Sequence, residues 1–95
     1  MKLFETRELQ EAVLFAMKGG QAIHLHRFNS GHPMFKRHPV IAHLFDRDKI
    51  RLIATARRLG VRVIKVEREG EQAQHIDLCG KPLDRACKET EGGLL

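Results

Sequence analysis

The sequence has no tryptophan and no tyrosine, and its aromatic side chains are five phenylalanines. The core must therefore be built mainly from Leu, Ile, Val and Ala, and few rings are available to stack on unpaired nucleic-acid bases. Two cysteines are too few for a disulfide framework, and no apolar run approaches the roughly 20 residues of a membrane-spanning helix. These absences argue against a disulfide-rich secreted scaffold and against an integral membrane protein.

The chain has 95 residues, enough for one domain with a single modest core, so we predict one domain over 1–95. Its first residues lack the apolar stretch and the small-residue cleavage site of a secretory signal. We therefore expect a cytoplasmic protein in which Cys79 and Cys87 are reduced thiols.

Acidic residues are missing from one long segment. Between Ala12 and Phe45 there is no Asp or Glu, yet this segment contains five of the six histidines. The net charge is +5, and its excess lies in residues 1–60, which have eleven basic and five acidic side chains against six and seven in 61–95. A region rich in cations and imidazoles but without carboxylates attracts anions, most readily phosphate.

The N-terminal part predicts a helix followed by a strand. Apolar residues recur at helical spacing after Thr6, a favourable N-cap, and a glycine pair ends the pattern, so we expect a helix over 7–18. Residues 21–28 alternate, with apolar side chains on one side and His24 and His26 on the other. That alternation is typical of a strand.

The middle of the chain predicts a β-α-β unit. The apolar run 40–45 reads as a strand, Asp46 as the N-cap of a helix, and Gly60 as the residue that closes this helix. The β-branched run 61–66 follows at once and reads as a second strand. Two strands joined by a helix should lie parallel, with a right-handed crossover.

The last third predicts a loop over 67–74, a short edge strand over 75–78 and a final helix. Lys81-Pro82 can open this helix, which we expect to run to about Glu89, because proline is tolerated in a first turn. Residues 91–95 should form a frayed tail.

These elements predict a small single α/β domain in the order α-β-β-α-β-(β)-α. The β-α-β unit lies at its centre, the sheet is mixed, and helices cover it. The expected core consists of Leu9, Val13, Ile23, Leu25, Ile41, Leu44, Ile50, Ile53, Leu59, Val61, Val63 and Val66.

The second half resembles a small bacterial and phage domain family of unknown function. The matching segments are Ala42-His43-Leu44-Phe45-Asp46, Ile53-Ala54-Thr55-Ala56-Arg57-Arg58-Leu59-Gly60, His75-Ile76-Asp77-Leu78 and Leu83-Asp84-Arg85-Ala86. The likeness spans 39–87 and departs from the family pattern at His75, where the family has an aromatic residue. It implies that His43 and Asp77 lie on adjacent elements near one end of the sheet, and it implies no activity.

Candidate catalytic residues are His43, His75 and Asp77. His43 lies in an apolar run just before a predicted helix, a position where α/β sheets often bind ligands. It could act as a general base or bind a phosphate, with Asp77 orienting it, or it could be a structural histidine bonded to a backbone carbonyl. The sequence leaves both explanations open.

Two patterns suit a metal ion but are incomplete. His24 and His26 share a strand face without a third ligand nearby, and they could equally lie on a half-exposed sheet surface. His75, Asp77 and Cys79 alternate and offer the ligand types of a zinc site, but Gly80 indicates that the chain is already turning at Cys79. We therefore predict no metal ion and no cofactor.

Basic residues form the second candidate site. Arg47 and Arg51 lie four apart on one side of the predicted second helix, which could track phosphates or simply face solvent. The long basic loop 28–38 is the better candidate. The predicted anion-binding residues are Arg27, Lys36, Arg37, Arg47 and Arg51.

No motif for nucleotide, zinc or acyl-transfer chemistry is present, such as GxxxxGK[ST], HExxH or GxSxG. The sequence therefore does not decide whether the protein is an enzyme. Our first hypothesis is a module that binds a polyanion, either nucleic acid or another phosphate-bearing ligand. The second is a small His/Asp-dependent phosphoester hydrolase or nuclease-like enzyme, with or without a metal ion. The third is a non-catalytic interaction protein that forms a homodimer through an edge strand.

Overall fold

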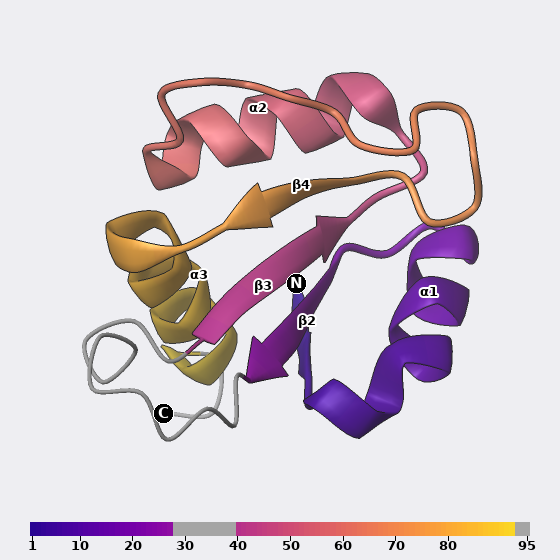
Figure 1. The fold of residues 1–95 in the computed structure, drawn as a ribbon, viewed down its shortest axis with the longest axis horizontal. Coiled ribbons are helices and arrows are strands. Elements are labelled where there is room, and N and C mark those ends of the chain that lie inside the picture. Colours follow the sequence, from indigo (N-terminus) through magenta and orange to yellow (C-terminus); the bar gives the residue numbers. More distant parts are fainter. Residues whose placement is uncertain (28–39, 93–95) are drawn as a thin grey trace.

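The structure is a computed structural model that describes residues 1–27 and 40–92. Within these residues it is a small α/β domain with one mixed four-stranded sheet in the order β1-β2-β3-β4 (Figure 1). Strand β1 is parallel to β2, and the other neighbours are antiparallel. The elements are β1 (Lys2–Phe4), the 3₁₀ turn η1 (Thr6–Glu8), α1 (Leu9–Met17), β2 (Ala22–Arg27), β3 (Val40–Phe45), α2 (Lys49–Leu59), β4 (His75–Leu78) and α3 (Gly80–Gly92).

Helices α2 and α3 cover one face of the sheet. Alternate strand residues point to this face, where they pack with Leu52, Ala56 and Leu59 of α2 and with Leu83 and Ala86 of α3. The strand residues of this main core are Ile23, Leu25, Ala42, Leu44, Ile76 and Leu78. Burying this many aliphatic side chains is the main stabilising contribution to the fold.

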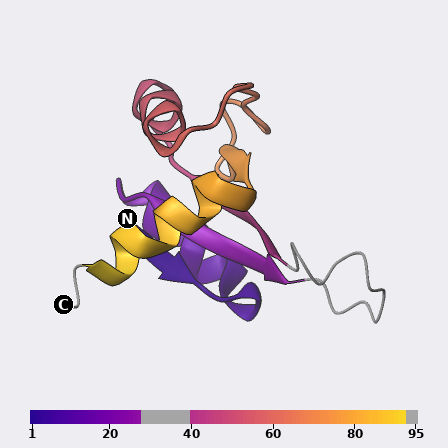
Figure 2. The ribbon, with the colours of Figure 1, turned by 90° about the vertical axis from the view of Figure 1, so that its left-hand side faces the viewer.

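Helix α1 packs on the opposite face, so that α1 and α2 lie on opposite sides of the strands (Figure 2). Its buried residues Ala12 and Ala16 contact Phe4, Ala22 and Phe45, which form a second, smaller core cluster. Apart from Ile41, the strand residues on the rest of this face are polar within the described part of the chain.

The predicted fold class is confirmed, but the predicted β-α-β unit is wrong. Residues 61–66 form no strand, and β3 instead lies between β2 and β4, antiparallel to both. Val61 and Ile64 pack partly against the core whereas Val63 is 83% exposed, so this segment does not keep the alternation of a strand. The parallel pair joined by a helix is β1-α1-β2, at the N-terminus.

Both predicted N-caps are corrected. The first helical segment begins with η1, where the Glu8 carboxylate accepts a hydrogen bond from the Glu5 amide, so Glu5 and not Thr6 is the cap. Helix α2 is capped by Asp48, whose side chain accepts a hydrogen bond from the Arg51 amide. Asp46 is buried instead.

The core prediction is confirmed for Ile23, Leu25, Leu44 and Leu59, which are buried. Leu9 and Ile50 are exposed, as is Val63. Helix α2 buries Leu52, Ala56 and Leu59, packs Ile53 partly against the same core and leaves Ile50 exposed. Which apolar positions of the helix are buried depends on the angle at which it packs, which local periodicity does not contain.

The final third follows the prediction. Strand β4 is an edge strand, the segment before it contains turns, and α3 begins at Gly80 and continues to Gly92, past the expected end. The predicted loop after β2 and the last three residues lie outside the described residues. Among the helices of the described residues, none combines the length and the apolar character needed to cross a membrane.

Candidate functional site

Four histidines and an aspartate lie on the face of the sheet that also carries α1. We call this surface the histidine face: His24 and His26 on β2, His43 on β3, and His75 and Asp77 on β4. The sheet register pairs His24 with His43 and His43 with Asp77. The His43 ring lies 4.6 Å from the ring of His75, 6.0 Å from that of His24 and 6.1 Å from that of His26. Side chains from three strands therefore meet around His43.

The apolar residues between these positions direct the histidines to this side. Ile23, Leu25, Leu44, Ile76 and Leu78 are all buried in the main core. Because neighbouring residues of a strand point to opposite faces, the residues between them must face the other way. A shift of register by one residue would bury the imidazoles under α2 and α3, so the core itself selects this arrangement.

His43 and Asp77 are directly opposite on β3 and β4. The Asp46 amide donates to the Gln74 carbonyl, and the alternation of an antiparallel ladder then makes His43–Asp77 a non-hydrogen-bonded pair, in which side chains lie closest. The His43 Nδ1 is 2.7 Å from Asp77 Oδ1. The His43 side chain is 22% exposed and the Asp77 side chain 53%, so the pair is accessible from solvent.

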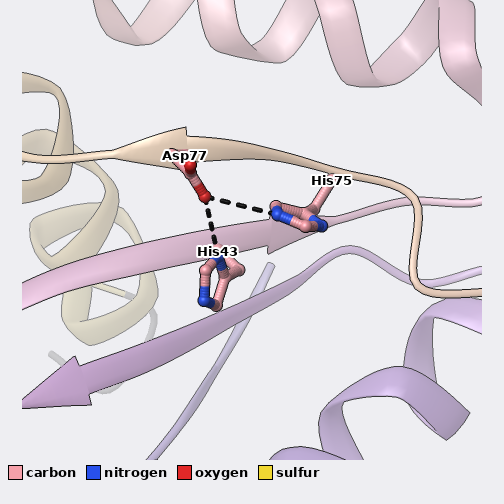
Figure 3. A group of neighbouring side chains, drawn as sticks. All are labelled: His43, His75 and Asp77. Carbon is pink, nitrogen blue, oxygen red and sulfur yellow. Dashed lines mark hydrogen bonds and ion pairs between the residues drawn. The ribbon is translucent and has the colours of Figure 1, made fainter. Parts of the chain in front are cut away.

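His75 contacts the same carboxylate oxygen. Its Nε2 lies 3.3 Å from Asp77 Oδ1, and its Nδ1 lies 2.8 Å from the Ala73 carbonyl. Figure 3 shows one oxygen of Asp77 joined to both imidazole rings. Because a carbonyl only accepts hydrogen bonds, Nδ1 of His75 carries a proton. Asp77 therefore bridges the two histidines.

His24 lies beside His43, on the neighbouring strand β2. Its ring stacks on that of His43 with an angle of 10° between the planes, and its Nε2–H donates to the Thr6 carbonyl over 2.9 Å. The Nδ1 of His24 is buried, and within the described part of the chain it has no hydrogen-bond partner. Because the proton of the neutral ring is on Nε2, Nδ1 carries a lone pair.

Burial lowers the pKa of His43. The hydrogen bond to Asp77 acts in the opposite direction and raises the pKa, but its effect is smaller, and the neighbouring His75 adds to the lowering. His43 is therefore neutral at physiological pH. With its Nδ1–H donated to Asp77, the lone pair of the neutral ring is on Nε2. Within the described residues no hydrogen bond engages this nitrogen.

The arginines predicted to bind anions are bonded within the protein. Arg27 forms an ion pair with Glu5 at 3.1 Å, and Arg47 donates to the Met17 carbonyl at 2.9 Å. Arg51 forms a 2.7 Å ion pair with the buried Asp46 and donates to the Gly19 carbonyl. The other two predicted anion ligands, Lys36 and Arg37, lie outside the described residues.

One group of possible metal ligands occurs in the described ranges 1–27 and 40–92. It consists of His43, His75 and Asp77, whose ligand atoms lie within 4.8 Å of one another. Cys79, which the sequence pattern joins to His75 and Asp77, is not a member of this group. Cys79 is exposed, Cys87 is half-buried, and neither forms a disulfide.

Sequence reasoning identified each of these three residues but did not indicate that His24 and His26 would lie beside them. The alternation of imidazoles with buried aliphatic residues on both strands was the available signal. This alternation indicates toward which face of the sheet each side chain points, but not which strands are neighbours.

Comparison with family models, with curated proteins and with solved structures finds no match for this chain. No relative therefore bears on the resemblance of residues 39–87. The function has to be argued from the geometry of the histidine face and from the charge of the chain.

Proposed function

We propose that this protein is a small phosphoester hydrolase that acts through His43, with Asp77 and His75. The observation that carries the proposal is the 2.7 Å contact between His43 Nδ1 and Asp77 Oδ1 on an accessible sheet face. A carboxylate in this position fixes the tautomer of the imidazole and stabilises the imidazolium that forms when the ring accepts a proton.

In the proposed reaction, Nε2 of His43 removes a proton from a water molecule. The water oxygen attacks phosphorus, and the bond from phosphorus to the leaving alcohol oxygen breaks. This oxygen takes a proton from solvent, to which the His43 imidazolium returns the proton that it accepted. A base must be unprotonated before it can act, and the lowered pKa of His43 supports this role. His75 contacts the same oxygen of Asp77.

The charge distribution supports a phosphate-bearing substrate. The chain carries a net charge of +5, and the segment from Ala12 to Phe45, which contains His43, has no acidic residue. A positive potential raises the local concentration of anionic substrates. Phosphoesters, including nucleic-acid backbones, are therefore the substrate class that we propose.

The test is hydrolysis of bis-p-nitrophenyl phosphate and of end-labelled RNA and DNA by the purified chain. We expect His43→Ala to lower the rate at least about a hundredfold, as is usual when a general base is lost. Asp77→Asn should lower it as well, because the amide no longer favours the charged imidazole. The matched control is Asp84→Asn, the same substitution at an exposed position on α3.

Wild-type and variant proteins should be purified identically, so that a contaminating enzyme would appear equally in all of them. Hydrolysis that persists unchanged in His43→Ala would contradict the proposal. So would a wild-type protein that cleaves none of these substrates.

A further inference from the structure

We propose that His43, His75 and Asp77 together bind a divalent transition-metal ion, with Zn²⁺ as the ion that best fits two imidazoles and one carboxylate. This inference deepens the proposed function and rests on it only for the reaction that the ion would support. The contacts of His75 indicate that an ion binds, whatever the reaction.

The proton positions around His75 leave a gap that a cation would fill. Its Nδ1 donates to the Ala73 carbonyl, so the neutral ring has a lone pair on Nε2. That lone pair lies 3.3 Å from a carboxylate oxygen of Asp77, which is also an acceptor. Two acceptors at this distance repel each other unless a positive charge lies between them. Either a proton or a metal ion must therefore occupy this position.

The spacing suits a metal ion. Zinc–nitrogen and zinc–oxygen bonds of about 2.0–2.1 Å at a tetrahedral angle separate neighbouring ligand atoms by roughly 3.3 Å. Nε2 of His75 and Oδ1 of Asp77 have this separation already. Nδ1 of His43 lies 2.7 Å from the same oxygen, so it would move away by about half an ångström as the ion replaces its proton.

The surroundings of these ligands are those of a metal site. Histidines that bind metals usually donate their other N–H to a carbonyl or a carboxylate, and His75 does so to Ala73. The Phe45 ring packs at 5.3 Å from the His75 ring and at 5.8 Å from the His43 ring, which restricts their orientations. Asp77 is on the exposed side, so a water molecule could complete the coordination, as in catalytic zinc sites.

A bound ion changes how water would be activated. His43 becomes a ligand through Nδ1, and the proton acceptor is no longer its ring. A Zn²⁺ ion held by His43, His75 and Asp77 would supply the nucleophile instead, by lowering the pKa of a water molecule at its open position.

The experiment is a calorimetric titration of the metal-stripped chain of 95 residues with Zn²⁺. We expect saturable binding of about one ion per chain, and a loss of affinity of at least about a hundredfold in His75→Ala and in Asp77→Ala, since even residues that merely support a ligand contribute up to that much. Two controls, Asp84→Ala and His26→Ala, should bind as the wild type does. Circular dichroism of each variant establishes that it is folded.

A second measurement does not depend on the variants. Co²⁺ bound by two nitrogens and an oxygen in tetrahedral geometry gives visible absorption bands, and Zn²⁺ should displace it. No saturable binding, equal binding in His75→Ala, or a loss in His26→Ala as large as that in His75→Ala would overturn the proposal.

Failure of this inference can be told apart from failure of the proposed function. Zinc binding that depends on His75, without hydrolysis of any phosphoester, would support the metal site and contradict the function. Hydrolysis by a chain that binds no Zn²⁺, at a rate that a chelator does not change, would support the function and contradict the metal site.

Discussion

At the scale of single residues, Asp46 shows how much of the charge of this chain serves the fold. It is fully buried, and its carboxylate accepts hydrogen bonds from Arg51 at 2.7 and 2.8 Å, from Gln21 at 2.9 Å and from the Asp48 amide at 2.9 Å. Because Arg51 also donates to the Gly19 carbonyl, the pair ties the segment after α1 to the start of α2. Arg51 therefore has a structural role that its position on a basic helix did not indicate.

The pKa of Asp46 gives a testable dependence on pH. Burial by itself would raise this pKa, but the hydrogen bond from Arg51, with those from the Asp48 amide and Gln21, lowers it below 3.8. The carboxylate thus binds protons less readily in the folded chain than in the unfolded one. Its contribution to stability is complete above about pH 4 and is lost as the pH falls through the lowered value.

We expect Asp46→Asn to lower the free energy of unfolding by about 3 kcal/mol at pH 7, because Arg51 loses a charged partner. The difference from the wild type should shrink below about pH 4. Urea unfolding at pH 7 and at pH 3 measures both values, and the exposed Asp84→Asn is the control. A difference that is equal at the two pH values would contradict this account.

At the scale of elements, the C-terminal end of α2 depends on backbone geometry that the sequence signals well. Gly60 closes the helix as predicted, with φ of +101°, in the left-handed region that side chains rarely adopt. A Cβ atom there would lie 2.7 Å from Nη1 of Arg85, which donates to the Leu59 carbonyl. Tertiary packing thus adds a second constraint to the local one.

Substitution can separate these two constraints. We expect Gly60→Ala to lower the free energy of unfolding by about 1–2 kcal/mol, the usual cost of the left-handed conformation, and by more if Arg85 cannot move aside. The matched control is Gly70→Ala, because Gly70 also has a positive φ of +81°, but a Cβ added to it would meet no atom within 4 Å. Urea unfolding of both variants measures the difference. A Gly60→Ala variant that is less destabilised than Gly70→Ala would show that the Arg85 contact costs nothing.

At the scale of the whole molecule, the net charge of +5 keeps polyanion binding as a second proposal. Arg27 and Arg51 already form ion pairs within the protein, so their guanidinium groups are less available to bind a phosphate. Phosphate contacts should therefore depend mainly on Lys36 and Arg37. A homodimer through an edge strand likewise stays a prediction.

Fluorescence anisotropy with short DNA and RNA tests the charge proposal. We expect affinity to fall about tenfold or more between roughly 50 and 200 mM salt, as several phosphate contacts require. Lys36→Ala/Arg37→Ala should weaken binding clearly, whereas Arg27→Gln should change it less than about twofold, because Arg27 already pairs with Glu5. Traces that stay flat at low salt would contradict polyanion binding.

Local sequence patterns predict some elements of the fold correctly and fail for others, and the reasons are physical. Strands 40–45 and 75–78 and the helix closed by Gly60 are confirmed, because alternation and end signals are local. The strand at 61–66 is wrong, since β-branched residues favour an extended chain without specifying a partner. Strand β1 is absent from the prediction because three residues are too few for a pattern.

The sequence by itself determined that 40–45 and 75–78 are strands and that α2 ends at Gly60, and it nominated His43, His75 and Asp77 as candidate site residues. These properties follow from the spacing of neighbouring residues. Only the tertiary structure decided that β4 lies beside β3, that His43 faces Asp77 across them, and that Arg51 bonds to Asp46 instead of facing solvent. Such pairings depend on contacts between residues 5 to 34 positions apart, which form when the whole core packs and which no local pattern encodes.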